Sequence, residues 1–158
     1  MKLKRLLLWM MVFLLVGCSS KPMELPKSEA LRSIEVYGVS EPTGIAVKED
    51  PKDIEMILGQ FGSAKATSEE SVNDSPQNAE GVIRIDLMHS EGGASSMFIY
   101  QRDGKYFAEQ PYAGVWEIEQ AVYDDFAQLA QNAEIPRAMM VDGKLYLDSG
   151  KEVINGPT

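Results

Sequence analysis

His89 is the only histidine in this 158-residue sequence, and histidine is the side chain best suited to proton transfer near neutral pH. Ser90 and Glu91 follow it, so the residue types of a Ser-His-acid triad are present. No Gly-x-Ser-x-Gly turn precedes His89, however, and no second histidine can help to hold zinc. We therefore expect a solvent-exposed histidine at the end of a strand, and we assign no catalytic residue.

Four oxygen-bearing side chains, Asn73, Asp74, Asn78 and Glu80, lie in one polar stretch. Ca²⁺ prefers such oxygens, but the stretch lacks the Asp-x-Asp-x-Asp-Gly spacing and the final glutamate of a calcium-binding hand. Asn73 and Asp74 before Pro76 are also typical turn residues. The turn interpretation is favoured, and no metal site is expected.

Eight of the eleven aromatic residues that follow Cys18 lie between residues 98 and 126. A helix packed on a sheet would bury most of them. Tyr112 and Trp116 are the expected exceptions, because they flank a turn and have polar tips. A recognition surface for a ligand or partner is expected to use the loop residues Asn73, Asp74 and Pro76 and the turn residues Glu109, Gln110, Pro111, Tyr112 and Trp116.

Apolar residues at a spacing of two predict the strands that would position these side chains. The expected strands cover residues 32–39, 43–48 (joined to the first through Glu41-Pro42), 82–88, 96–102, 105–110 and 115–118. The Asp103-Gly104 pair predicts a two-residue hairpin that sets Phe98 opposite Glu109. It also sets Arg102 against Lys105, so either a bulge or a solvated hairpin end is expected.

Two helices are predicted. Asp50 can accept hydrogen bonds from free N–H groups and Pro51 needs no donor partner, so this pair begins the first helix. Its apolar stripe is formed by Ile54, Ile57, Leu58 and Phe61, and Gly62 is expected to end it. The second helix covers residues 119–132, with Val122, Phe126 and Leu129 on one side.

A polar stretch of 19 residues, 63–81, separates the first helix from the strand at 82–88. Loops of this length are usually functional or mobile. A last hairpin, over residues 138–141 and 144–147, closes on Asp142-Gly143. The predicted fold class is α+β: a mainly antiparallel sheet with two helices packed on it, plus a C-terminal β-hairpin.

The N-terminus has the organisation of an export signal. Lys2, Lys4 and Arg5 precede an apolar run over residues 6–16. This run is too short to cross a bilayer, which takes about 20 apolar residues, but it suits a secretory signal. It ends in Leu15-Val16-Gly17-Cys18, which resembles a lipobox, so cleavage between Gly17 and Cys18 is expected.

Cys18 is the only cysteine, so no disulfide framework exists and a covalent diacylglycerol on Cys18 is the expected modification. An unmodified buried cysteine beside an uncleaved helix is the alternative. The expected localisation is the extracytoplasmic face of the cell membrane. The expected segments are a signal peptide (1–17), a lipidated tether (18–28), the α+β domain (29–135) and a C-terminal hairpin and tail (136–158).

The charge balance disfavours nucleic acid as a partner. The formal net charge is −9, and removal of Lys2, Lys4 and Arg5 with the signal lowers it to −12. Phosphate-rich partners are bound by clusters of Lys and Arg, and no basic run follows the signal.

Three stretches carry a resemblance to a known family: Ser-Val-Asn-Asp-Ser-Pro (71–76), Phe98-Ile99-Tyr100 with Gly104-Lys105-Tyr106, and Glu-Gln-Pro-Tyr-Ala-Gly-Val-Trp (109–116). They resemble an extracytoplasmic domain of Gram-positive bacteria, domain-of-unknown-function family 5301, over roughly residues 31–129. The resemblance implies a small lipoprotein, or an extracellular part like those of membrane proteins related to the M56 antibiotic-sensing peptidases, and no assigned activity. Residues 140–152 resemble the opening of another module, so they form a truncated module or a hairpin packed on the domain.

These observations favour a non-catalytic binding or sensory accessory module whose partner is a cell-surface protein or envelope ligand. Two alternatives remain. One is a carboxylate-dependent hydrolase of envelope polymers, since no catalytic carboxylate pair can be told apart among acids scattered over the whole chain. The other is a structural envelope lipoprotein.

Overall fold

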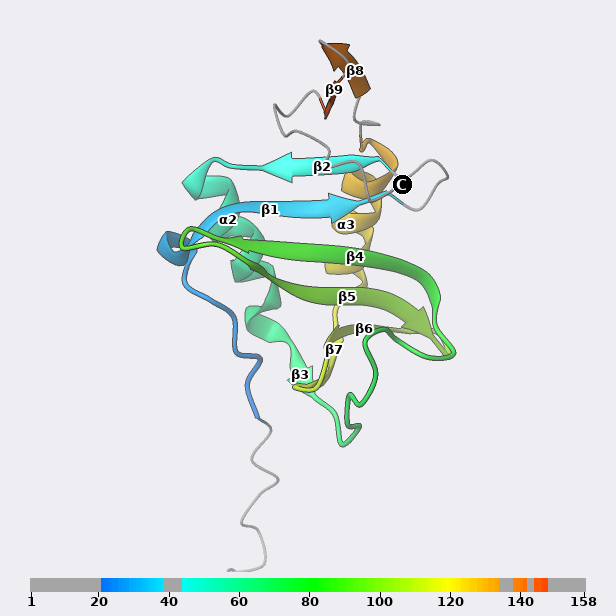
Figure 1. Ribbon diagram of the computed structural model, residues 1–158. Coiled ribbons are helices and arrows are strands. Elements are labelled where there is room, and N and C mark those ends of the chain that lie inside the picture. The colour runs from blue at the N-terminus through cyan, green and yellow to red at the C-terminus, as the bar shows by residue number, and fades with distance from the viewer. Residues whose placement is uncertain (1–20, 39–43, 134–137, 142–143, 148–158) are drawn as a thin grey trace, which may run out of the picture.

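The computed structural model describes residues 21–38, 44–133, 138–141 and 144–147. Its main element is a seven-stranded antiparallel sheet in the order β2-β1-β4-β5-β6-β7-β3 (Figure 1). The strands are β1 (Leu31–Tyr37), β2 (Ile45–Lys48), β3 (Lys65–Ala66), β4 (Glu80–His89), β5 (Ala94–Arg102), β6 (Lys105–Gln110) and β7 (Gly114–Ile118). The helices are α2 (Pro51–Gly59) and α3 (Gln120–Gln131), with the short 3₁₀ helices η2 (Ser28–Ala30) and η3 (Gln60–Ser63).

The predicted α+β class is confirmed. The predicted C-terminal hairpin is also present, as β8 (Ala138–Val141) paired with β9 (Lys144–Leu147) in a separate two-stranded sheet. The turns expected at Asp142-Gly143 and Glu41-Pro42 lie outside the described residues. Among the residues that the structure describes, no helix is both long and apolar enough to cross a membrane.

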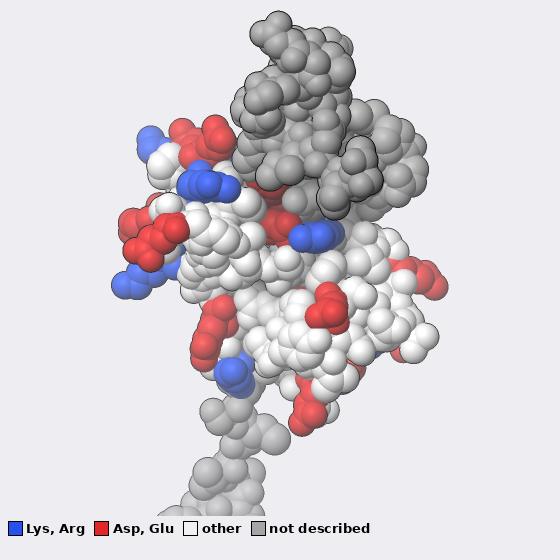
Figure 2. Space-filling view, viewed as in Figure 1, with Lys and Arg blue, Asp and Glu red and all other residues white. Residues whose placement is uncertain are grey.

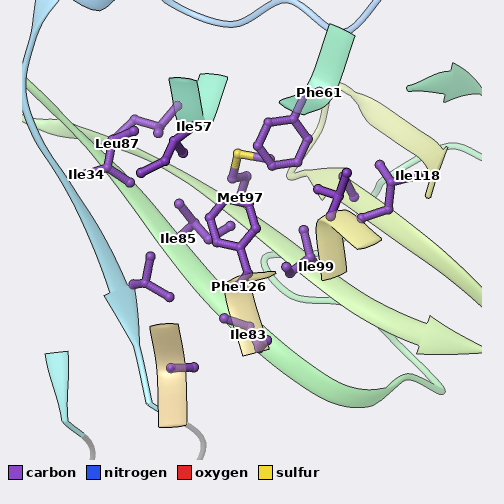
Figure 3. Packing of buried hydrophobic residues seen from close by; sticks show 14 of the residues in the cluster. Ile34, Ile57, Phe61, Ile83, Ile85, Leu87, Met97, Ile99, Ile118 and Phe126 are labelled. Atoms are coloured by element: carbon purple, nitrogen blue, oxygen red, sulfur yellow. The ribbon is translucent and has the colours of Figure 1, made fainter. Parts of the chain in front are cut away.

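Both helices pack on one face of the sheet, and the main core lies between them. Every second residue of β4 and β5 points to this face, and Ile83, Ile85, Met97 and Ile99 are at most 1% exposed. Phe126 of α3 is fully buried against them (Figure 3). The alternation in the sequence therefore predicted this face correctly.

Helix α2 begins as predicted and ends differently. The Asp50 side chain accepts a hydrogen bond from the Lys52 backbone N–H at 2.8 Å. The expected stop at Gly62 is wrong: α2 ends at Gly59, and the chain continues as η3, with Gly62 inside it. The physical reason is Phe61, which packs 5.6 Å from the ring of Phe126 and so keeps this extra turn against the core.

The β5–β6 hairpin has the predicted register without a bulge, with Phe98 opposite Glu109 and Arg102 opposite Lys105. The like-charged pair is tolerated because each cation has its own acidic partner. Arg102 forms an ion pair with Glu69, and Lys105 forms one with Glu117 at 2.8 Å. These partners come from a loop and a neighbouring strand, which the hairpin pattern alone does not indicate.

The polar stretch 63–81 is not a loop throughout. It contains β3, which pairs with β7 at the sheet edge through Lys65 and Ala66. A strand of two residues is too short to show a period, so the sequence did not predict it. The loop proper, residues 67–79, then crosses the face of the sheet opposite the helices.

Candidate functional site

The loop 67–79 covers part of the helix-free face of the sheet. Tyr100, Phe107 and Val115 form a second buried cluster there, and Ala79 of the loop packs against it. The guanidinium of Arg102 lies over the rings of both Tyr100 and Phe107, at 5.7 and 4.9 Å from their centroids. This face therefore joins aromatic packing to charge, unlike the face under the helices.

A buried carboxylate fastens the loop to the sheet. Glu109 is only 7% exposed, and it accepts hydrogen bonds from the hydroxyls of Ser71 at 2.7 Å and Tyr100 at 3.1 Å. Burial, and next the nearby charge of Glu109, raises the pKa of Tyr100 above its ordinary value. Tyr100 is thus held as a neutral donor. The expectation that Glu109 lies on the surface is wrong, because its side chain points into this network.

The same serine also joins the loop to the β6–β7 turn. The backbone N–H of Tyr112 donates to the Ser71 hydroxyl at 3.2 Å, and the Tyr112 hydroxyl donates to Asp74 at 2.9 Å. The bond to Asp74 raises the pKa of Tyr112. The two segments that the sequence singled out therefore form one unit. We call residues 71–76 and 110–113 the loop–turn surface.

Tyr112 is held in an unfavourable backbone conformation at the tip of this surface. Its φ is +61°, in the left-handed region that bulky residues avoid, and its side chain is 69% exposed. Val72, also a residue of the loop–turn surface, is 63% exposed. Strained residues persist where the surrounding structure over-determines them, and they concentrate at functional sites. The surface presents an aromatic and an aliphatic side chain in a fixed arrangement.

An open groove of about 610 Å³ lies between the loop–turn surface and the sheet. Its lining residues are Asp74, Arg84, Ser95, Ser96, Phe98, Gln110, Pro111 and Ala113. The turn residues form one wall, Asp74 contributes from the loop, and β4 and β5 form the floor. The groove thus offers both apolar contact and hydrogen-bonding groups to a ligand.

Arg84 is held in the floor of the groove by a buried carboxylate. Asp86, 3% exposed, accepts from Arg84 Nε at 2.9 Å and Nη2 at 2.8 Å, and from the Ser96 hydroxyl at 2.7 Å. The hydrogen bond to Asp86 raises the pKa of Arg84. Since the Arg84 side chain is 51% exposed, the outer edge of the fixed guanidinium is accessible to a ligand.

Tyr37 supports this arginine from β1. The Arg84 guanidinium lies 5.1 Å from the centre of the Tyr37 ring, and the Tyr37 hydroxyl donates to Glu35 at 3.1 Å. Burial, and next the charge of Asp86, raises the pKa of Tyr37. The positive guanidinium and the negative face of the ring attract each other, so the position of Arg84 is fixed from two sides.

Three other predicted residues differ in their exposure. Asn73 is exposed and Pro76 is half-buried on the loop, where both remain accessible. Trp116 is 2% exposed, so its expected exposure is wrong. Its strand β7 is not the edge of the sheet, because β3 pairs with it, and its indole N–H donates to the backbone carbonyl of Lys21 at 2.9 Å.

The floor of the groove was missed by the sequence reasoning. Side chains alternate along a strand, so Arg84 and Asp86 lie on the face opposite Ile83 and Ile85, but nothing in the sequence indicates that they lie beside Ser96 and Phe98. That neighbourhood depends on the β4–β5 register, in which Arg84 pairs with Phe98 and Asp86 with Ser96. No two-residue turn motif fixes this register in advance.

His89 also lies near the groove. Its Nε2 is 2.7 Å from the hydroxyl of Ser95, a lining residue. No acidic side chain among the described residues forms a hydrogen bond with the imidazole, so the third member of a triad is absent from this part of the chain. In the same part, no three His, Cys, Asp or Glu side chains come close enough together to hold a metal ion.

Charged side chains are dispersed over the face of the described residues that Figure 2 shows. Figure 2 shows one face on which Asp and Glu are spread widely and the described Lys and Arg form no patch. The predicted modification site, Cys18 with Gly17 before it, lies outside the described residues.

Comparison with known proteins supports the family resemblance and adds no activity. The family model DUF5301, described as "Domain of unknown function (DUF5300)", matches residues 19–117, which include the loop–turn surface and the groove. A protein from Ruminococcus gnavus, known from an NMR structure, has a similar fold with a TM-score of 0.52 and 32% sequence identity. The similarity covers 63% of this chain and 97% of that chain. No curated protein matches this chain.

Proposed function

We propose that this chain, which belongs to the DUF5301 family of domains of unknown function, is a lipoprotein anchored by lipid to the outer face of the cell membrane. We also propose that its domain binds a partner without catalysis. The basic start, the short apolar run and Gly17-Cys18 in register support the anchor. Two acyl chains on one cysteine hold a protein on a membrane far more firmly than one chain does.

The binding proposal rests on Tyr112, whose side chain is exposed to solvent while hydrogen bonds hold its position. Three hydrogen bonds, Ser71 to Glu109, Tyr112 to Ser71 and Tyr112 to Asp74, order the loop–turn surface before any partner arrives. Pre-ordering lowers the entropy cost of association, and exposed tyrosines are common among the residues that dominate binding energy. The groove beside Tyr112 adds depth to an otherwise convex tip.

The non-catalytic part of the proposal is supported by the state of the two buried acids on this face. Asp86 is engaged by Arg84 and Ser96, and Glu109 by Ser71 and Tyr100. Both carboxylates are therefore engaged in holding neighbouring side chains in place.

Capture from solubilised envelope tests binding. The mature domain, its Tyr112→Ala variant and a Met56→Ser control would each be immobilised, and captured proteins quantified by mass spectrometry. Met56 is 62% exposed on α2, away from the loop–turn surface, so the control removes a comparable exposed apolar group. We expect one protein to be lost with Tyr112→Ala and retained with Met56→Ser. Equal capture by all three would refute the binding surface.

Mass spectrometry of the protein purified from its own cells tests the anchor separately. A chain that begins at Cys18 with a diacylglyceryl thioether is expected. An intact Met1 or an unmodified sulfur would refute the anchor and leave the binding surface to be judged by the capture experiment.

A further inference from the structure

We infer that residues 21–27 are a docked strut that holds the loop–turn surface at the bilayer, and that the partner is a segment of an integral membrane protein. The inference rests on the proposed lipid anchor at Cys18. Residues 18–28 were expected to be a lipidated tether, and residues 21–27 are the part of this segment that the structure describes before η2.

Residues 21–27 are extended and form contacts along the domain. The Lys21 carbonyl accepts from the indole N–H of Trp116 at 2.9 Å, and the Glu24 carbonyl accepts from the Gln110 side chain at 3.1 Å. Between and beyond these bonds, Met23 and Leu25 pack against the main core. Four successive attachments are more than a freely moving linker would make.

This docking shortens the free part of the tether. If residues 18–28 were free, ten peptide units would reach about 35 Å from the lipid. With Lys21 bound to Trp116, only three units remain between the anchor and the domain, a reach of about 10 Å. The part of the domain around Lys21 must therefore stay close to the bilayer.

The loop–turn surface lies at that same end of the molecule. Gln110, which binds the strut, is itself a residue of the loop–turn surface and lines the groove. Trp116 lies on β7, and β7 pairs with β3, from which the loop 67–79 departs. Figure 1 shows β3, this loop and the first described residues at one end of the sheet, with β2 at the opposite edge. Five strand spacings separate β7 from β2, or about 24 Å.

The chemistry of the surface favours a protein over lipid headgroups. The loop 67–79 contains Glu69, Glu70 and Asp74 and no Lys or Arg. Acidic segments are repelled by anionic headgroups, and recruitment to such lipids uses basic clusters. The exposed Val72 and Tyr112 suit the apolar contacts of a protein interface. With Glu69 paired to Arg102, Glu70 and Asp74 still give the loop a negative charge, which complements a basic segment. An extracellular segment next to a transmembrane helix would lie at the required height.

Paramagnetic broadening tests the strut. The mature chain, whose only thiol is Cys18, would be coupled to a maleimide lipid in nanodiscs of neutral phosphatidylcholine with nitroxide-labelled headgroups. Amide signals of residues 110–113 are expected to lose most of their intensity, while those of residues 45–48 in β2 keep most of theirs. Equal broadening of the two groups would overturn the inference.

A variant with Met23→Ser and Leu25→Ser removes the apolar packing of the strut and changes no residue of the sheet or the helices. The difference between the two groups of signals should then shrink, whereas the Met56→Ser control should preserve it. Because the lipid is attached chemically, this result does not depend on lipidation in the cell. A failure of the strut is thus distinguishable from a failure of the proposed anchor.

Two further outcomes decide the kind of partner. The uncoupled domain should not bind vesicles of neutral or anionic lipid, and binding to either would make the bilayer itself the partner. In the capture experiment, the protein lost with Tyr112→Ala should be an integral membrane protein. If the protein lost with Tyr112→Ala were soluble or linked to the cell wall, the assignment of the partner would be overturned.

Discussion

The two faces of the sheet are held together by different physics. Under α2 and α3, the core consists of apolar side chains that are almost fully buried, and none of them is charged. On the opposite face, the loop 67–79 is fastened by the buried carboxylate of Glu109 through Ser71, and by an ion pair between Glu69 and Arg102, whose guanidinium lies over Phe107. A second buried carboxylate, Asp86, holds Arg84 and Ser96 within the sheet. The first arrangement tolerates conservative exchange of apolar groups, whereas the second depends on particular atoms.

This difference explains where a binding surface can be placed. Apolar packing is non-directional, so a core of this kind stabilises the domain without fixing any exposed side chain in one orientation. The hydrogen bonds of Glu109 and Ser71 are directional, and they determine where Tyr112 points. The helix-covered face thus provides the scaffold, and the loop-covered face provides the recognition geometry.

The most severe test of this contrast is Glu109→Ala. It leaves the hydroxyls of Ser71 and Tyr100 without their buried acceptor. We expect a loss of about 2–4 kcal/mol in the free energy of unfolding, together with faster amide exchange in residues 67–79. Urea denaturation and hydrogen exchange would measure the two effects.

Two variants calibrate the Glu109 result. Glu109→Gln keeps an acceptor oxygen for Ser71 and should recover much of the stability. On the helix-covered face, Ile99→Val should cost about 0.5–1.5 kcal/mol without selectively freeing the loop. If Ile99→Val released residues 67–79 as strongly as Glu109→Ala, the two faces would not be independent.

The helix-covered face was predictable from the sequence because apolar residues recur there at the regular spacing of a strand or a helix. Ile83 and Ile85 in β4 alternate, and Phe126 lies on the stripe of α3, so the burial pattern could be read from spacing alone. The β5–β6 register was also predictable, because the two-residue turn Asp103-Gly104 leaves no freedom in pairing.

The loop-covered face was only half predictable. The loop and turn could be singled out by composition, but their union through Ser71 joins residues 41 positions apart in the sequence. Trp116 was assigned to the surface because nothing in the sequence marks β3 as the neighbouring strand of β7 or Lys21 as the hydrogen-bond partner of the indole. Contacts of this kind are long-range and carry no period.

Alkaline pH should weaken the loop-covered face through Tyr100. Its pKa is raised in the folded state, so above about pH 10 the unfolded chain releases a proton that the folded chain retains. Stability should be fully present below that pH and fall by about 1.4 kcal/mol per pH unit above it for this one group. Tyr100→Phe should start less stable near neutral pH but decline less steeply in urea denaturation between pH 9 and 11. An unchanged slope would contradict this assignment.

The smallest expected effect is the difference in stability between two variants of Tyr112, which distinguishes the strain of its backbone from the contacts of its side chain. Glycine adopts a φ of +61° without steric cost, whereas alanine there retains most of the strain that tyrosine bears. Tyr112→Gly should therefore be more stable than Tyr112→Ala by about 1 kcal/mol in urea denaturation, while both lose the captured partner. Equal stabilities would mean that the turn relaxes once the ring is removed, and that contacts of the ring with Asp74 hold the strain in place. Retained capture by the glycine variant would instead place recognition in the groove, with Arg84 and Phe98, and not at the tip.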